Sequence, residues 1–286
     1  MKTDFYQQIT NQIITALENG VKPWVCPWER SRFNGLPYSL QSQKTYSGIN
    51  VLLLWGAAAE HGYSSPAWLT YKQAKSLGGQ VRKGEKGTQI VFYKTLEKET
   101  DNGDKEKIPM LRTFTVFNLD QIDDIASPEA TEKHGGGGFD ALDYVEGFVA
   151  STGAIVNERG DRAFFSPSQD QITMPDRERF NQANDYYATL LHELAHWTGH
   201  KSRLDRKGGK RFGDSDYAFE ELVAELGAAF MCADLGISGD VQHESYIASW
   251  LDRLKDDKRF IFKAASAASK AHQLCVDLAF SLDRAA

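Results

Sequence analysis

Residues 187–199 read YATLLHELAHWTG, and the pattern H-E-x-x-H within them is the strongest signal in the chain. Apolar residues around the pattern predict a buried helix. Residues four apart share one face of a helix, so His192 and His196 can reach a single metal ion. Glu193 lies beside them and can take a proton from a water molecule. The stretch therefore predicts a mononuclear metal site of the zinc-peptidase type.

A third metal ligand is expected from a second helix over residues 215–236. Its segment Glu220-Glu221-Leu-Val-Ala-Glu225 resembles the gluzincin pattern, in which a ligand glutamate is followed four residues later by an acidic group that orients a histidine. The resemblance implies Glu221 as the ligand and Glu225 as the outer carboxylate, with the reverse assignment left open. Glu220 points elsewhere on this helix and is interpreted as a solvated carboxylate.

Other polar residues near the motif are less suited to bind the metal ion. His200 follows Gly199, which disrupts the helix, so we expect a loop role for this histidine instead of metal binding. Ser202 stands where another zinc-peptidase class has its third histidine, which excludes that class. Candidates to stabilise an oxyanion, which the sequence does not rank, are Tyr217, His243 and Tyr246. A short strand over 162–165 offers an edge for an extended peptide.

The charge distribution separates the two ends of the chain. The net charge is −6, with 33 Lys+Arg and 39 Asp+Glu, which by itself argues against nucleic-acid binding. Most of the acidic excess lies after residue 125, however, and residues 66–95 contain six basic side chains against one acidic side chain. A local basic stripe can bind phosphates even on an acidic protein.

The clearest boundary is the segment 126–138, where a charged, Pro-containing stretch ends in four consecutive glycines. We therefore expect a mixed α+β domain over 1–125, a glycine-rich linker over 126–138, and a mainly helical domain with a small sheet over 139–286. The predicted helices are 4–19, 48–61, 70–77, 139–152, 176–199 and 215–236, with further helices from 244 onward; the predicted strands are 88–96, 110–118, 162–165 and 171–174.

Aromatic residues are interleaved with the basic ones in the N-terminal domain. Aromatic rings stack on unpaired bases while Lys and Arg follow the phosphates, so this mixture suits single-stranded nucleic acid. The DNA-contact candidates are Lys72, Arg82, Lys83, Lys86, Trp28 and Tyr46. The alternative is that the aromatic residues belong to the core and that the lysines lie at a solvated hairpin tip without contacting DNA.

Several stretches together resemble plasmid-borne antirestriction proteins of the ArdC type, and the N-terminal part also resembles conjugative TraC primases. They are YSGIN at 46–50, WLTYKQA at 68–74, GGQVRKGEKG at 78–87, the segment 166–175, HELAHWTGHKSRL at 192–204, and the segment 220–230. The resemblance implies a single-stranded-DNA-binding domain joined to a zincin-like metallopeptidase domain, which together protect incoming plasmid DNA from host restriction.

The expected cofactor is Zn²⁺, because two histidines and one carboxylate suit zinc, although Mn²⁺ or Co²⁺ can occupy the same ligands. The expected partners are single-stranded DNA and an unknown protein substrate, for which a host restriction component is the candidate. The alternative is a protein that only binds single-stranded DNA and whose metal site is structural or catalytically silent. A metal nuclease is disfavoured, because phosphodiester chemistry usually recruits carboxylate-rich metal sites.

Bulk features exclude two further classes. No apolar run is long enough to span a bilayer, and the first ten residues have no signal-peptide pattern, so we expect a cytoplasmic protein without membrane contact. The three cysteines, Cys26, Cys232 and Cys275, are far apart and odd in number. They predict reduced thiols in place of a disulfide framework.

Overall fold

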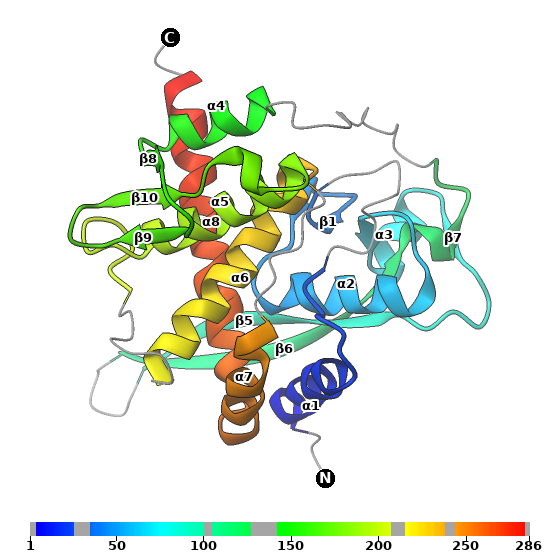
Figure 1. Ribbon diagram of the computed structural model, residues 1–286. Coiled ribbons are helices and arrows are strands. Elements are labelled where there is room, and N and C mark those ends of the chain that lie inside the picture. Colours follow the sequence, from blue (N-terminus) through cyan, green and yellow to red (C-terminus); the bar gives the residue numbers. More distant parts are fainter. Residues whose placement is uncertain are drawn as a thin grey trace.

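The computed structural model describes residues 4–25, 35–99, 105–126, 142–206, 215–237 and 244–283. Helices are combined with several small sheets (Figure 1), which confirms the α+β class. Within these ranges no helix combines the length and apolar character that a membrane span requires. Cys232 and Cys275 are buried thiols, while Cys26 lies outside the described residues.

The N-terminal helices match the expected segments because each has a local start or stop signal. Helix α1 (Phe5–Glu18) begins after Asp4, whose carboxylate accepts a hydrogen bond from the backbone of Gln7. Helix α2 (Ile49–His61) ends at Gly62, which has a left-handed φ of 70°. Helix α3 (Tyr71–Ser76) begins with a capping box between Thr70 and Gln73.

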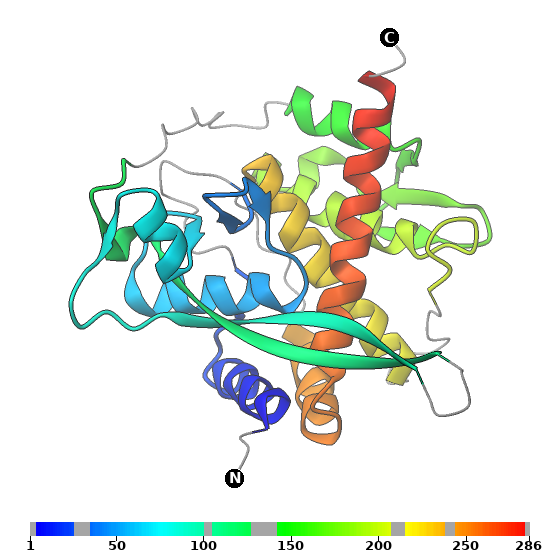
Figure 2. The same ribbon diagram turned by 180° about the vertical axis from the view of Figure 1, so that it is seen from behind.

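A five-stranded sheet has the order β2-β1-β3-β6-β5. Its short members are β1 (Tyr38–Ser39), β2 (Lys44–Thr45) and β3 (Ala67–Leu69), and its long antiparallel hairpin is β5 (Thr88–Glu99) with β6 (Lys105–Asn118). The hairpin strands are longer than predicted, and the turn between them, 100–104, lies outside the described residues. Both views show the hairpin running along α2 (Figures 1 and 2). The side chain of Asn50 fixes it there by pairing with the backbone N–H and C=O of Val91, both at 2.8 Å.

A two-stranded sheet and a 3-10 helix complete this half. Strands β4 (Gln80–Val81) and β7 (Ile122–Asp123) form an antiparallel pair, and the 3-10 helix η1 (Leu119–Gln121) precedes β7.

The C-terminal half consists of helices and a three-stranded sheet. The helices are α4 (Asp143–Ser151), α5 (Ala183–Thr198), α6 (Ser215–Leu235), α7 (Glu244–Asp256) and α8 (Phe260–Asp283). The strands are β8 (Ile155–Glu158), β9 (Phe164–Ser166) and β10 (Gln171–Met174), in the order β8-β10-β9. Strand β9 pairs with β10 along one side only, so it is an edge strand.

The motif helix begins later than predicted. Residues Arg177–Arg179 form a separate 3-10 helix, η2, and Phe180 after it has an extended backbone. The ring of Phe180 packs edge-on against Tyr186, with centroids 5.3 Å apart, which turns the chain before α5 begins at Ala183. This aromatic contact interrupts a segment whose composition alone suggested one continuous helix.

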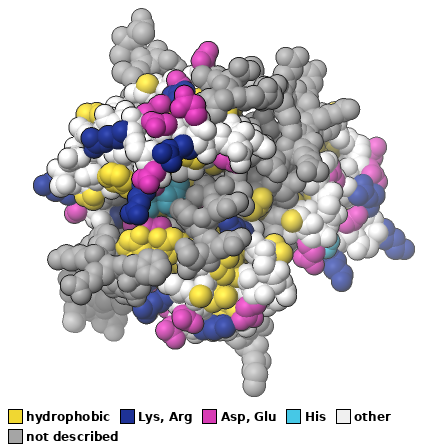
Figure 3. Space-filling view, in the orientation of Figure 1, with side chains coloured by type: hydrophobic (Ala, Val, Ile, Leu, Met, Phe, Trp, Pro, Cys, Tyr) yellow, Lys and Arg dark blue, Asp and Glu magenta, His cyan; other side chains and the backbone are white. Residues whose placement is uncertain are grey.

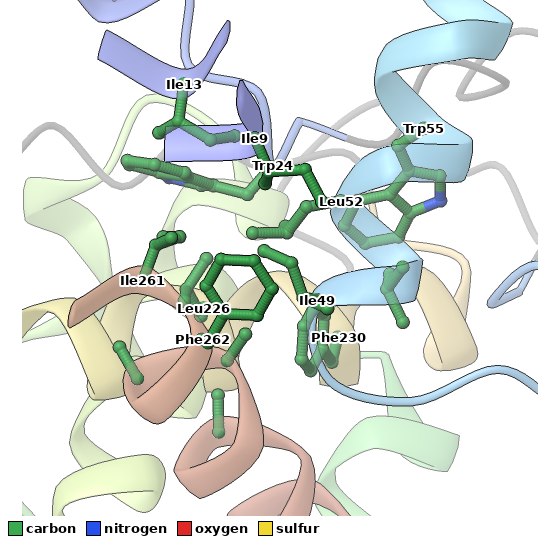
Figure 4. Close-up of a cluster of buried hydrophobic side chains, with 14 of the residues drawn as sticks. Ile9, Ile13, Trp24, Ile49, Leu52, Trp55, Leu226, Phe230, Ile261 and Phe262 are labelled. Atoms are coloured by element: carbon green, nitrogen blue, oxygen red, sulfur yellow. The ribbon is translucent and has the colours of Figure 1, made fainter. Parts of the chain in front are cut away.

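The largest core cluster contains side chains from both ends of the chain (Figure 4). Ile9 and Ile13 of α1 and Ile49, Leu52 and Trp55 of α2 are buried together with residues of α6, α7 and α8. The contributing side chains from these later helices include Leu226, Phe230, Trp250, Ile261 and Phe262. Each fully buried side chain of this size contributes about 1.5–3 kcal/mol to stability. Helix α1 and the helices after residue 215 therefore stabilise one another.

Helix α6 lies between this cluster and a second one. Leu222, Leu226 and Phe230 belong to the first, whereas Ala228 and Met231 belong to the second, which also contains residues of α4, α5, β10 and α8. A helix that is apolar on all sides is a central one. The domain border expected over 126–138 stays a prediction, since residues 127–141 lie outside the described ones.

The shared core predicts one unfolding transition for the whole chain. The ring of Phe230 on α6 meets Trp55 on α2 edge-on, with centroids 5.8 Å apart. We expect Phe230→Ala to lower the free energy of unfolding by about 3–5 kcal/mol and to shift that single transition. Circular dichroism and tryptophan fluorescence, followed during urea unfolding, measure it. The matched control is Phe280→Ala, because Phe280 is 63% exposed on α8. A second transition that keeps the wild-type midpoint would contradict the shared core.

Candidate metal centre

The two histidines of the motif face each other from successive turns of α5. His192 and His196 have ring centroids 4.8 Å apart, and their Nε2 atoms are separated by 3.1 Å. Two ring nitrogens at this distance repel each other unless they share a proton or a cation. Nitrogens bound to one tetrahedral ion at about 2.0–2.1 Å would be roughly 3.3 Å apart, which is close to the observed separation.

Glu221 of α6 brings a carboxylate to the same point. Its oxygens lie 3.8 Å from Nε2 of His192 and 3.6 Å from Nε2 of His196. The ligand atoms of these three residues all lie within 4.8 Å of one another, so they could hold a metal ion. Two imidazoles and one carboxylate form a donor set that suits a divalent transition metal, and the residues therefore fit the expected ion.

The close approach of α5 and α6 depends on small residues. A Cβ atom on Gly227 would lie 3.1 Å from the Cβ atom of Ala195, which is tighter than ordinary contact. Glycine at this position lets the two helices pack closely enough for Glu221 to reach the histidines.

The three candidate ligands line a pocket of about 740 Å³. Glu193 lines it together with both histidines. Figure 3 shows a histidine surface on this face, with acidic, basic and apolar side chains around it. Two of the three oxyanion candidates, Tyr217 and Tyr246, line the same pocket, and their hydroxyl oxygens are 3.1 Å apart. The third candidate, His243, lies outside the described residues.

The expectation for Glu220 was wrong. Its side chain is buried, not solvated, and its Oε1 lies 3.2 Å from Nδ1 of His196. Arg206 donates to both carboxylate oxygens of Glu220, at 2.7 and 3.0 Å, and also to the backbone carbonyl of Ala195 at 2.7 Å. Glu220 thus holds the outer nitrogen of His196 and leaves Nε2 directed at the metal-binding point.

Glu225 takes the corresponding position beside the other histidine. Its Oε2 lies 3.8 Å from Nδ1 of His192, on the side of the ring away from Glu221. This geometry agrees with the assignment of Glu221 as the inner carboxylate and Glu225 as the outer one.

Burial and charge set the protonation of the centre. Burial lowers the pKa of His196, but the hydrogen bond to Glu220 and the charges of three nearby carboxylates outweigh it and raise the pKa to about 9. Burial raises the pKa of Glu221, but the neighbouring His192 and the positive charge of the two histidines outweigh burial and lower the pKa below the ordinary value of 4.5. The candidate ligand Glu221 is therefore ionised at neutral pH. Burial and the hydrogen bond with Tyr246 raise the pKa of Tyr217, which therefore keeps its proton.

His200 is not brought to the metal-binding point. Its Nδ1 lies 2.8 Å from the hydroxyl of Ser202, and the residue lines the pocket wall. The loop that carries it is held by Arg203, which pairs with Asp170 and whose guanidinium lies 3.7 Å above the ring of Trp197. The loop role expected for His200 agrees with these contacts.

The structure leaves most of the DNA-contact candidates at the surface. Lys72 on α3 and Lys83 and Lys86 on the turn before β5 are exposed. Arg82 pairs with Glu85 and Asp123, which occupies its guanidinium. Tyr46 is half-buried against the main core, and burial raises its pKa to about 12. Trp28 lies outside the described residues.

One exposed aromatic pair was not predicted. Phe92 on β5 and Phe114 on β6 are 54% and 46% exposed, and their rings meet edge-on with centroids 6.2 Å apart. Arg112, also exposed, is the cross-strand partner of Phe92. The alternation of the two strands predicts one face for these residues, but it does not predict that both rings are exposed.

Two family profiles match the chain on either side of residue 130. Residues 3–117 match the N-terminal domain of anti-restriction factor ArdC. Residues 143–267 match a zincin-like metallopeptidase family.

Similar proteins span nearly the whole chain. The protein y4eC of Sinorhizobium fredii (strain NBRC 101917 / NGR234) is 40% identical over 279 residues, which cover 94% of this chain and 90% of the relative. The DNA primase TraC of Escherichia coli is 39% identical over 291 residues; the match covers 94% of this chain but 27% of the primase.

Two solved structures have the same fold. They are the metal-free and the Mn(II)-bound antirestriction ArdC protein from the R388 plasmid. The metal-free structure superposes with a TM-score of 0.83 at 46% identity, covering 97% of this chain and 98% of the other. The Mn(II)-bound structure superposes with a TM-score of 0.81 at 47% identity, covering 96% and 98%.

The pKa of His196 predicts that metal binding depends on pH. A proton and an ion compete for Nε2, and the pKa of this imidazole in the metal-free chain is about 9. We expect the affinity for Zn²⁺ to rise by about tenfold per pH unit between pH 6 and 8, as one proton is released. Calorimetric titration in buffers of different ionisation enthalpy measures both quantities. Glu220→Gln, which removes the negative charge beside Nδ1 of His196, should reduce the slope; an affinity that does not change with pH would contradict the prediction.

Proposed function

The chain belongs to the ArdC antirestriction family, and on that premise we propose that it protects incoming plasmid DNA from host restriction by combining single-stranded DNA binding with a metal-dependent peptidase site. The proposed place of action is the cytoplasm, where a host restriction component is the expected protein substrate. The observation that carries the peptidase part is the convergence of His192, His196 and Glu221 on one point of an open pocket that Glu193 also lines.

The proposed metal ion is zinc, held by His192, His196 and Glu221, and the Mn(II) in the solved ArdC structure supports a divalent ion in this family. Such an ion, when bound, supplies Lewis acidity, which polarises a peptide carbonyl and acidifies a water molecule. The buried carboxylates Glu220 and Glu225 orient the two histidines for it.

Residues of the chain supply the proton transfers. Glu193 accepts a proton from the attacking water as the oxygen of that water bonds to the peptide carbonyl carbon. The same proton then passes from Glu193 to the leaving nitrogen as the C–N bond breaks. Tyr217, which keeps its proton, donates a hydrogen bond to the developing oxyanion, with Tyr246 as the neighbouring hydroxyl.

The substrate in this proposal is an extended protein segment. Edge strand β9 lines the pocket through Phe164 and Phe165, and its backbone can pair with an added strand. The aromatic wall suits an apolar side chain of the substrate near the cleavage point.

The proposed DNA-binding surface is formed by the exposed turn and hairpin of the N-terminal half. Lys83 and Lys86 on the turn before β5 supply charge for phosphates. Phe92 and Phe114 on the hairpin offer aromatic faces for bases, with Arg112 beside them.

The peptidase part is tested by Glu193→Gln, which keeps the size of the side chain but removes its basicity. We expect this variant to bind metal and DNA like the wild type and to lose protection of incoming DNA. Loss of a general base slows such a step by about 10²–10⁴-fold. The measurement is the survival of transferred plasmid in a restricting host, at matched expression. Full protection by the variant would favour the competing function, in which the chain only binds DNA and its metal site is catalytically silent.

The DNA-binding part is tested by its salt dependence. The double substitution Lys83→Ala and Lys86→Ala removes two proposed phosphate contacts. For a single strand, it should reduce the slope of log affinity against log salt concentration by about 0.7 per lysine. Fluorescence anisotropy with a labelled oligonucleotide measures the slope. The control replaces Lys263 and Lys270, exposed lysines of α8, by alanine. Equal affinity of the wild type for duplex DNA, or equal slopes for the two double variants, would contradict the assignment.

A further inference from the structure

Glu225 is a buried carboxylate beside His192, one of the candidate metal ligands. It is 4% exposed, lies one turn after Glu221 on α6, and faces Nδ1 of His192 at 3.8 Å. A carboxylate taken out of water is costly unless charged or hydrogen-bonding groups surround it. The groups that compensate Glu225 therefore also determine where its oxygens lie beside His192.

Two of these groups come from the segment that follows α1. Nε1 of Trp24 donates to Oε1 of Glu225 at 3.4 Å, a long hydrogen bond, and Nζ of Lys22 lies 3.7 Å from the same oxygen. The side chain of Lys22 is itself 12% exposed, so the ion pair is largely shielded from water. The other oxygen of Glu225 is the one that faces His192.

Trp24 is held firmly enough to act as a fixed donor. It is 2% exposed and lies in the shared core with side chains of α1, α2, α6 and α8 (Figure 4). Its ring meets Trp250 of α7 edge-on with centroids 5.6 Å apart, and Nε1 of Trp250 donates to the backbone carbonyl of Ala218 on α6. The indole of Trp24 thus has a set place relative to the helix that carries Glu225.

We propose that Lys22 and Trp24 are positioning residues of the metal centre, which fix the carboxylate of Glu225 and, through it, the imidazole of His192. The proposal rests on the metal site of the proposed function. The two histidines then depend on different parts of the chain. His196 is oriented by Glu220 and Arg206, from α6 and the loop after α5, whereas His192 is oriented through a chain of contacts that begins near the N-terminus.

The simpler reading is that these contacts only join the N-terminal segment to α6 and stabilise the fold. The two readings differ in what they predict for metal binding. A purely structural contact changes the unfolding free energy and leaves the metal affinity of the folded chain unchanged. A positioning contact changes the affinity and the ligand geometry of the folded chain.

The test titrates Zn²⁺ into the metal-free full chain and records the visible absorption of the Co²⁺ form. Trp24→Phe keeps the buried ring and removes the N–H donor. We expect about tenfold weaker Zn²⁺ binding, in the range of outer-shell substitutions at metal sites, together with a changed Co²⁺ spectrum. The matched control is Trp55→Phe, because Trp55 is buried in the same core cluster and its ring meets Phe230 instead of Trp250. It should leave the affinity and the spectrum unchanged.

Glu225→Gln tests whether the effect passes through this carboxylate. In the Glu225→Gln background, Trp24→Phe should cause no further loss of Zn²⁺ affinity, because residue 225 then carries no charge for Trp24 to position. Trp24→Phe with wild-type affinity and spectrum, or the same loss in both backgrounds, would overturn the proposal.

Lys22→Met separates position from charge. If Lys22 acted only as a nearby positive charge, its removal would tighten Zn²⁺ binding, and tighter binding would overturn the positioning role of Lys22. Weaker Zn²⁺ binding by Lys22→Met supports that role. A wild-type chain that binds no Zn²⁺, or a His192→Ala variant that binds it equally well, would instead show that the metal site itself is wrong.

Discussion

Burial of negative charge is the constraint on which this structure depends. Four glutamates, Glu193, Glu220, Glu221 and Glu225, are nearly inaccessible to solvent around two imidazoles. Arg206 and Lys22 contact two of these carboxylates directly and offset two of the four charges. A divalent cation between the histidines would offset the other two with both imidazoles neutral. Without it, protons take part of that role, which agrees with the raised pKa of His196.

The sequence predicts those residues of the centre that lie within one helix, but it does not predict the residues that come from distant segments of the chain. Helical periodicity places His192, Glu193 and His196 together, and the resemblance to the gluzincin pattern implies Glu221 and Glu225 as the nearby carboxylates. The prediction for Glu220 is wrong because it assumes a solvated side of α6, whereas the apolar residues of this helix are buried on all sides. No local pattern reveals the contacts of Arg206, or of the segment 22–24, because they depend on how helices distant in sequence pack together.

The same packing relates the two halves of the chain. The N-terminal profile and the metallopeptidase profile match separate segments of the chain. The buried side chains nevertheless form a cluster that includes α1, α2 and the hairpin together with α6, α7 and α8. The much longer primase relative matches 94% of this chain, so both halves occur together there as well, as a shared core requires.

The shared core also orders events during synthesis. Ile9, Leu52 and Trp55 are made early, yet their partners on α6 and α8 follow well over one hundred residues later. At a translation rate of about 5–20 residues per second, these apolar side chains wait on the order of ten seconds or more for their contacts. Contacts between residues so far apart in sequence close large loops and slow folding. The apolar side chains of the nascent N-terminal half therefore stay without these partners until the last helices have been made, and only then does the chain acquire its native core.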